Sequence, residues 1–252
     1  VKGYKIPESS RNGKGIPVIN IINIEKDEKV TALVPINREW EINGYLFFVT
    51  KNGLCKRVEA KEFESIRQSG KIAITMKEDD ELVTVKPTLG DEEIIIAASN
   101  GKAVRFDERG VRAMGRNASG VRGMNVDGST VIGACTSKEG AQILVVSKYG
   151  YGKKTPVEEY RITSRGAKGV KTININESNG ELVALKAVNG DEDALIMRND
   201  GVIIRISLSN VSTLGRVTKG VRLIKPEENT YVKTVTLMDH QDEEETSEEE
   251  GE

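Results

Sequence analysis

Short apolar runs and polar turns alternate along the chain at a nearly constant interval. Four runs of four or five mainly apolar residues are each followed by a two-residue turn and then by a shorter basic run. Three of the four turns are Asn-Gly or Asp-Gly, which tolerate the positive φ angles of a tight hairpin. We therefore predict four β-hairpins, with first strands at 45–49, 94–98, 143–146 and 194–197 and second strands at 55–58, 104–106, 153–155 and 203–206.

A basic segment centred on a glycine, here called the glycine phrase, repeats with the same period. Its glycine stands at positions 15, 70, 120, 169 and 220, at steps of 55, 50, 49 and 51 residues. After each phrase we expect a third strand with alternating character, such as residues 170–175, then a polar turn and a fourth strand. The fourth strands should begin near Val30, Leu82, Val131, Leu182 and Val232. Four short strands per 50 residues or so, without helical periodicity, predict an all-β array of the propeller kind.

The first repeat differs from the others because no apolar hairpin precedes its phrase. Residues 1–238 therefore hold four full repeats and one partial repeat, about five blades in all. Either strands are exchanged between neighbouring repeats, or the chain has been shortened at its N-terminus. The pattern alone does not choose between these explanations.

Charge is distributed unevenly along the chain. The formal net charge is −2, but residues 239–252 hold nine acidic residues and no lysine or arginine, so residues 1–238 carry a net charge of +7. A block of like charges cannot bury enough apolar surface to fold, so we expect 239–252 to be a disordered acidic tail. We hypothesise that this tail competes with nucleic acid for the basic body.

Several classes of protein and site are disfavoured. No apolar run approaches the roughly 18 residues of a membrane span, and no secretory leader opens the chain, so we expect a soluble, cytosolic protein. Cys55 and Cys135 lie in separate repeats without metal-ligand spacing, so we expect buried or half-buried thiols. His240, the only histidine, lies in the acidic tail, and no phosphate-binding loop is present, so a metal site or a hydrolase is disfavoured.

The glycine phrases carry the candidate binding residues. An arginine stands three or four residues before each glycine, and further cations stand next to it or within two residues. A row of evenly spaced cations matches double-stranded DNA, which carries about one negative charge per 1.7 Å. Single-strand binding would require aromatic stacking platforms, and aromatic residues make up only 4% of the chain. The candidate DNA-binding residues are Arg11, Lys14, Arg67, Lys71, Arg116, Arg122, Arg165, Lys168, Lys171, Arg216, Lys219 and Arg222.

A structural explanation of the phrase must be weighed beside the functional one. Glycine could recur because every repeat needs the same turn, and arginine because it caps strand carbonyls or pairs with an acid. Five copies with cations in each, on a body of charge +7, favour DNA binding. A protein-interaction scaffold of the propeller type is the alternative function.

The phrases at 4–22, 111–124, 149–155 and 164–170 resemble the C-terminal domain of the bacterial DNA gyrase A subunit, and more distantly the paralogous domain of topoisomerase IV. The resemblance implies a β-pinwheel, a propeller-like disc of four-stranded blades that wraps duplex DNA around its basic perimeter. Such a wrap serves negative supercoiling by a type IIA topoisomerase.

The resemblance also carries expectations about partners and cofactors. It implies association with the gyrase B subunit, together with the rest of the gyrase A subunit, in an A2B2 assembly. It further implies no membrane partner, a monomeric isolated domain, and a place in the cytoplasm at the nucleoid. We expect this chain to hold no catalytic residue, metal or cofactor. The resemblance implies that DNA cleavage takes place, and that ATP and Mg²⁺ act, in other parts of the holoenzyme.

One departure from the family pattern concerns the first blade. The family's defining box, Gln-Arg-Arg-Gly-Gly-Lys-Gly, lies in that blade, and the nearest phrase here is 9–15. Residues 4–8 before it resemble the family's second blade. The resemblance therefore implies that the chain holds five blades of six, without the box.

Overall fold

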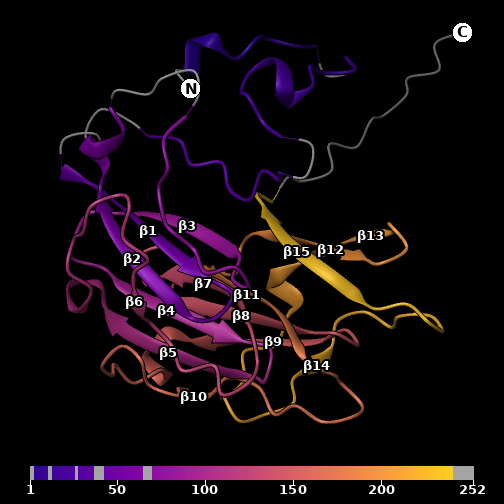
Figure 1. Ribbon diagram of the computed structural model, residues 1–252. Coiled ribbons are helices and arrows are strands. Elements are labelled where there is room, and N and C mark those ends of the chain that lie inside the picture. Colours follow the sequence, from indigo (N-terminus) through magenta and orange to yellow (C-terminus); the bar gives the residue numbers. More distant parts are fainter. Residues whose placement is uncertain (1–2, 11–12, 26–27, 37–42, 65–69, 241–252) are drawn as a thin grey trace, which may run out of the picture. The chain divides into compact units, whose positions relative to one another are not determined.

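The computed structural model describes residues 3–10, 13–25, 28–36, 43–64 and 70–240 (Figure 1). They form two compact units, which we describe separately. The first unit comprises Val1–Lys138 and Tyr160–Val170, and the second comprises Glu139–Glu159 and Lys171–Glu252. In the described part of the chain, no helix is long and apolar enough to cross a membrane.

All four predicted hairpins are present. In each, a buried first strand pairs antiparallel with the basic second strand across the expected turn, as Val49 does with Cys55. In the first unit these hairpins are β1 (Tyr45–Thr50) with β2 (Leu54–Glu59) and β4 (Glu93–Ala98) with β5 (Lys102–Asp107). In the second unit they are β8 (Gln142–Ser147) with β9 (Tyr151–Pro156) and β12 (Asp193–Arg198) with β13 (Ile203–Ser207).

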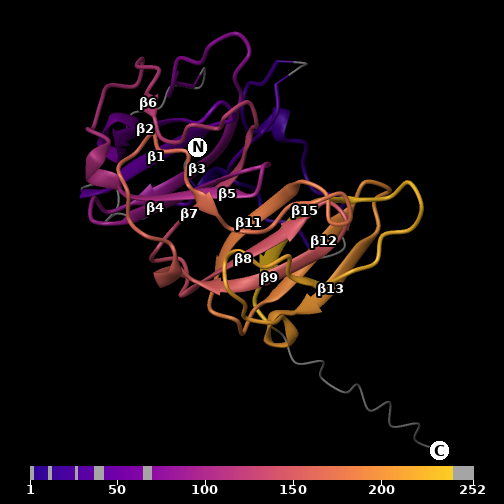
Figure 2. The ribbon, with the colours of Figure 1, turned by 90° about the horizontal axis from the view of Figure 1, so that it is seen from below.

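The fourth strand of each full repeat begins at the predicted residue and pairs with the first hairpin strand of its own repeat (Figure 2). These strands are β3 (Leu82–Thr88), β7 (Val131–Thr136), β11 (Leu182–Val188) and β15 (Val232–Met238). The prediction of a strand near Val30 is wrong, because the described residues 28–36 form no strand. A fourth strand needs a hairpin of its own repeat for its backbone hydrogen bonds, and residues 1–44 contain none of the predicted hairpins.

In each four-stranded sheet, the edge strand that pairs with the second hairpin strand comes from the next repeat. β6 (Val121–Arg122) pairs with β2, β10 (Val170–Lys171) pairs with β5, and β14 (Val221–Arg222) pairs with β9. The described sheets have the orders β3-β1-β2-β6, β10-β5-β4-β7, β11-β8-β9-β14 and β13-β12-β15. The all-β pinwheel prediction is thus confirmed, with strand exchange between repeats. The sheet β13-β12-β15 has three strands in the described part of the chain, since the described residues after Gly220 contain no further glycine phrase to supply a fourth.

These exchanged strands are shorter than predicted. Residues 170–175 were expected to form one strand, but β10 contains only two residues. In the matching segment after β14, the amides of Leu223 and Ile224 turn away from the sheet and both donate to the Gly150 carbonyl, at 2.8 and 3.3 Å. The chain therefore leaves the sheet to cap the hairpin turn of the preceding repeat.

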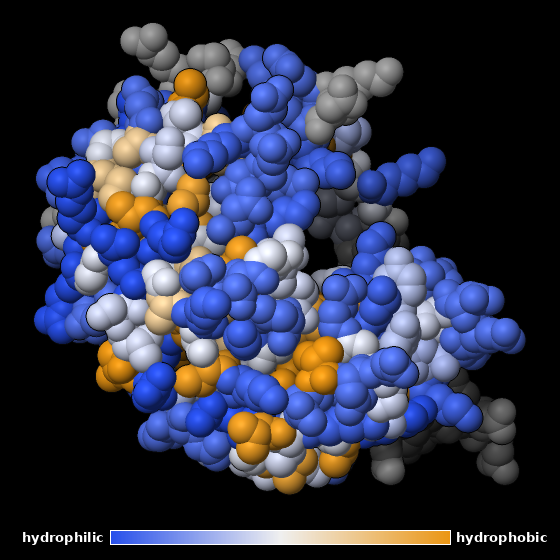
Figure 3. All heavy atoms as spheres, turned by 60° about the horizontal axis from the view of Figure 1, so that its bottom comes forward, coloured by the Kyte–Doolittle hydropathy of each residue, from blue (hydrophilic) through white to orange (hydrophobic). Residues whose placement is uncertain are grey.

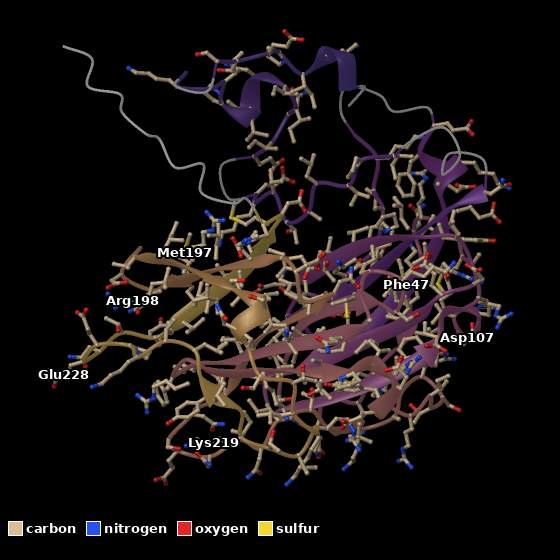
Figure 4. The ribbon with its side chains drawn as sticks, turned by 180° about the vertical axis from the view of Figure 1, so that it is seen from behind. Phe47, Asp107, Met197, Arg198, Lys219 and Glu228 are labelled. Carbon is tan, nitrogen blue, oxygen red and sulfur yellow. The ribbon has the colours of Figure 1, made fainter. Side chains whose placement is uncertain are left out.

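Each unit has its own aliphatic core. In the first unit Phe47, which points into the body of the unit in Figure 4, lies 6.3 Å from Phe106 between ring centroids. Cys55 and Cys135 are buried and form no disulfide, as predicted, and burial raises the pKa of Cys55 to about 12. The core of the second unit includes Leu144, Val146, Ala194, Ile196 and Leu208.

The predicted acidic tail, residues 239–252, falls largely outside the described residues. Residues 239 and 240 are described, and Nδ1 of His240 lies 2.8 Å from Oδ1 of the buried Asp193 at the start of β12. Residues 241–252, which hold most of the predicted acidic tail, lie outside the described residues.

Candidate nucleic-acid interface

The glycine of the phrase is required both by its backbone angle and by close packing. Gly169 has φ of +79°, and a Cβ atom at this position would lie 2.4 Å from the carbonyl oxygen of Ala103 in β5. A side chain would therefore be strained and would collide with the preceding hairpin. The same constraints hold at Gly120 against Cys55 and at Gly220 against Gly152.

Gly15 and Gly70 provide a contrast. Both have positive φ, but no heavy atom lies within 4 Å of a Cβ built on either. Among the described residues, no hairpin precedes the repeats that contain them, so neither glycine packs on one. The backbone conformation of the phrase is therefore local, whereas the close approach depends on strand exchange.

The arginine four residues before the glycine connects one phrase to the preceding phrase. Arg165 donates from its guanidinium to the Arg122 carbonyl at 3.2 Å and from Nε to the Gly110 carbonyl at 2.9 Å. Arg116 donates in the same way to Ile72 at 3.1 Å, and Arg216 to Lys171 at 2.9 Å. All three phrase acceptors stand two residues after their own glycine. Arg165 and Arg216 thus cap carbonyls of short strands, as the structural explanation requires, whereas Ile72, the acceptor of Arg116, lies in no strand.

A backbone hydrogen bond repeats beside each arginine. The amide of Asn125 donates to the Ala167 carbonyl at 2.9 Å, and the amide of Asn174 donates to Thr218 at 3.1 Å. The amide of Thr75 makes the matching bond to Ala118 at 3.3 Å. Within each unit, successive phrases therefore lie side by side in a fixed register.

The cations two residues after the glycine face outward. Arg122, Lys171 and Arg222 are the second residues of β6, β10 and β14, and all three side chains are exposed. Because these strands are the edges of their sheets, the three cations occupy equivalent places on the outside of their blades. They are the members of the predicted set best placed to meet a ligand in solution.

The remaining predicted residues fall into several groups. Lys168 lies 3.2 Å from Asp127, and its hydrogen bond lowers the pKa of that carboxyl group. Lys71 donates to the Glu62 carbonyl at 3.0 Å, and Lys14 is exposed. Arg11 and Arg67 lie outside the described residues.

An aromatic ring holds two of the predicted cations in the second unit. Arg222 donates to the hydroxyl group of Tyr151 at 2.7 Å, and its Cζ lies 4.9 Å from the ring centroid. Nζ of Lys219, on the outside of this unit in Figure 4, lies 4.1 Å from the same centroid. The hydrogen bond from Arg222 lowers the pKa of Tyr151. The two cations are therefore fixed close together by one ring.

The second hairpin strands also contain buried structural lysines, which the sequence pattern did not reveal. Lys153 is completely buried, and its Nζ donates to the Gly215 and Arg216 carbonyls at 2.5 and 2.7 Å and to Oγ1 of Thr218 at 2.9 Å. Burial lowers its pKa to about 8. The ammonium group therefore secures the loop that leads into the next glycine phrase.

Lys56 makes the corresponding contacts in the first unit. It is completely buried and donates to the carbonyls of Ala73, at 2.7 Å, and Arg116. Burial lowers its pKa to about 8 as well. The strand register could have predicted the burial of both lysines. Lys56 stands opposite Phe48 and Lys153 opposite Val145, and directly opposed residues lie on the same face of a sheet, here the buried one.

The surface fits a polar ligand better than an apolar one. Hydrophilic side chains cover most of the face drawn in Figure 3, with only small hydrophobic patches among them. Among the described residues, no group of three or more His, Cys, Asp or Glu side chains is placed to hold a metal ion. The chemistry available at the phrases is hydrogen bonding and charge.

The comparisons with known proteins agree with this architecture. The family model described as the DNA gyrase C-terminal domain, beta-propeller, matches residues 1–37, 44–88, 92–134, 141–189 and 199–236. The DNA gyrase A subunit of Staphylococcus epidermidis is 43% identical over 245 residues, covering 96% of this chain and 27% of that protein. The chain thus spans about a quarter of the length of that relative.

Two solved structures have the same fold. The C-terminal domain of DNA topoisomerase IV superposes with a TM-score of 0.82 and 29% identity, covering 89% of this chain and 71% of the other. The DNA gyrase A C-terminal domain gives a TM-score of 0.78 and 25% identity, with coverage of 89% and 75%. The exchanged strands, the repeated glycine phrases and the family match over five segments lead to one conclusion: the chain belongs to the family of DNA gyrase C-terminal domains.

Proposed function

We propose that this chain binds duplex DNA along its glycine phrases and wraps it, serving negative supercoiling by a type IIA topoisomerase of the gyrase kind. The observation that carries the proposal is the equivalent outward placement of Arg122, Lys171 and Arg222. A polymer with evenly spaced phosphates can meet such cations one blade after another. Family membership supports DNA as that polymer.

The contacts expected are with the DNA backbone. Arginine and lysine at the sheet edges would neutralise phosphates and release counterions, which gives affinity without base recognition. Bending 20–30 base pairs sharply costs on the order of 1–6 kcal/mol, so several phosphate contacts per blade must offset it.

The arginines four residues before the glycine have a supporting part in this proposal. Arg116, Arg165 and Arg216 each bond to a carbonyl of the preceding phrase, so the phrases are held in register before DNA arrives. A preorganised row of cations loses less side-chain entropy on binding than a flexible one. Their predicted role is therefore positioning as well as charge.

The wider assembly is part of the same proposal. The chain would act with a gyrase B subunit, together with the rest of a gyrase A subunit, and DNA cleavage and ATP hydrolysis with Mg²⁺ would take place in those parts. By itself it would be a monomer without catalytic residues or cofactor, acting at the nucleoid.

The salt dependence of DNA binding tests the proposal. The logarithm of the binding constant for a duplex should fall by several units per decade of salt. Replacing Arg122, Lys171 or Arg222 by alanine should make that slope shallower by about one unit each. Lys138→Ala is the matched control, because Lys138 is an exposed cation paired with Asp91 outside the phrases, at 2.6 Å. An affinity indifferent to salt, or an equal effect of the control, would refute the proposal.

A topological assay separates wrapping from simple binding. Relaxed circular DNA closed by ligase in the presence of the chain should change its linking number if DNA is wrapped. The alternative, a protein-interaction scaffold, predicts an unchanged linking number and no salt-dependent DNA binding.

A further inference from the structure

The second unit contains an open groove lined by exposed aromatic rings and cations. Its volume is about 460 Å³, and it lies between the hairpin turn after β8 and the loop before β15. We call it the tyrosine groove, defined by Lys148, Tyr149, Arg222 and Tyr231. It lies beside the proposed path of duplex DNA, because Arg222 belongs to both.

Aromatic exposure is the unusual feature of the tyrosine groove. Tyr149 and Tyr231 are 40% and 38% exposed, although the chain has only six tyrosines. Their backbones are anchored: the Tyr149 amide donates to Asn179 at 3.0 Å, and the Tyr231 amide donates to the side chain of Asn199 at 2.8 Å. Two rings are therefore presented to solvent from fixed positions in one concavity.

The cations of the groove are also fixed. Nζ of Lys148 lies 5.2 Å from the ring centroid of Tyr231. Arg222 is held by its 2.7 Å hydrogen bond to the Tyr151 hydroxyl group. Lys148 also lies 3.3 Å from the carboxylate of Glu181. The groove thus combines aromatic surface with two cations in set positions, of which Arg222 is the one without a carboxylate partner among the ion pairs of the described residues.

The lining also contains one acidic residue, Glu227. Glu227 lies 3.4 Å from a guanidinium nitrogen of Arg198, which also binds Asp200. Figure 4 shows Arg198 and the neighbouring Glu228 at the same end of the unit. Arg198 thus shares its single charge between two carboxylates, so Glu227 keeps part of its negative charge, and the phosphate contact depends mainly on Arg222 in the same lining.

We propose that the tyrosine groove binds an unpaired nucleotide of single-stranded DNA. Its base would stack on Tyr149 or Tyr231, and its phosphate would meet Arg222 or Lys148. Stacking on a ring is indifferent to base identity, so the site would accept any sequence. A duplex cannot use the rings, because its bases are already stacked, and an acidic peptide would need the cations but not the two exposed rings. The inference rests on the proposed function only in taking DNA as the polymer.

Fluorescence anisotropy with a labelled thymine oligonucleotide and the full chain tests the inference. Tyr149→Ala and Tyr231→Ala should each weaken single-strand binding by about tenfold, since removing a stacking partner has effects of this order. Tyr149→Phe and Tyr231→Phe should bind as the unchanged chain does, because the ring and not the hydroxyl group is needed. A blunt duplex should bind all five proteins equally.

Ile162→Ala is the matched control, because Ile162 is 57% exposed and lies in the other unit. Circular dichroism should show the same fold in every variant. The inference is overturned if the alanine variants bind the oligonucleotide as well as the unchanged chain, or if the chain binds duplex but not single strand. Binding of neither polymer would refute the proposed function together with this inference.

Discussion

The chain has two kinds of basic strand that look alike in sequence and differ completely in the structure. Two of the second hairpin strands bury a lysine, Lys56 or Lys153, that donates to a carbonyl in the loop of the next repeat. The exchanged strands expose Arg122, Lys171 and Arg222 at the sheet edges. One kind of cation holds the protein together, and the other is available to a ligand.

Register explains the difference. Lys153 stands opposite Val145, which is fully buried, whereas Arg222 stands opposite the half-buried Tyr151 at the outer edge. A buried ammonium group is stable only when carbonyls replace its water, and the turn before Gly220 provides them. The charge of a basic strand therefore reveals little about DNA binding until its pairing partner is known.

Lys153→Met should produce the largest effect that this comparison predicts. The substitution removes the donor to the Gly215 and Arg216 carbonyls, and we expect a loss of about 3 kcal/mol in the free energy of unfolding. Lys171→Met, at an exposed edge, should change stability by less than about 0.5 kcal/mol. Urea unfolding followed by circular dichroism measures both.

The order of the two effects should reverse when DNA affinity is measured under conditions in which both variants are folded: Lys171→Met should now have the larger effect. Lys171→Met should make the salt slope shallower, while any folded Lys153→Met protein should keep the slope of the unchanged chain. Equal stability losses for the two variants would contradict the division into buried and outward cations.

Much of this fold is predictable because its signals are local. Asn-Gly and Asp-Gly turns located three of the four hairpins, and the period placed the starts of β3, β7, β11 and β15 at the residues observed. The recurrence of glycine followed from a left-handed backbone angle and from contact with a neighbouring carbonyl, as at Gly169 and Ala103. Both constraints act on a single position, so the requirement for glycine there is visible directly in the sequence.

Other features depended on pairing between repeats and could not be predicted. The sequence allowed strand exchange but did not identify the partner of each third strand, so Val30 was assigned a strand and 170–175 too long a strand. The carbonyl-capping role of Arg165 depends on the Arg122 carbonyl, which becomes adjacent only after the exchange. The tyrosine groove was missed because composition counts aromatic residues and does not locate them.

Arg165→Ala should have an effect on stability between those of Lys153→Met and Lys171→Met, because Arg165 is exposed like the outward cations but donates to carbonyls like the buried ones. It removes hydrogen bonds to Gly110 and Arg122, and because the side chain is exposed we expect a loss of about 1–2 kcal/mol in the free energy of unfolding. Arg122→Ala leaves the accepting carbonyl in place and should be nearly neutral. Thermal unfolding of the two variants decides the matter, and a neutral Arg165→Ala would show that this arginine does not support the phrase.

The smallest expected effect is a dependence of stability on pH between about 8 and 10.5. Burial lowers the pKa of Lys56 and of Lys153 from 10.5 to about 8. Below pH 8 both the folded and the unfolded chain hold these lysines charged, and the folded state bears the desolvation cost. Between the two pKa values the unfolded chain keeps protons that the folded chain has released, so the free energy of unfolding rises with pH.

We expect a rise on the order of 1 kcal/mol, less than the pKa shifts alone would give, because the carbonyls around each ammonium group favour its charged form and offset part of the desolvation cost. Urea unfolding from pH 7.5 to 9 measures it, and Tyr151→Phe removes the parallel contribution of Tyr151, whose pKa is also lowered in the folded chain. Lys171→Met keeps both buried lysines and should show the full rise, whereas Lys153→Met should show about half. A stability that stays level or falls over this interval would mean that the carbonyls around Lys56 and Lys153 stabilise the charged form fully, so that burial carries no net electrostatic cost in the folded state.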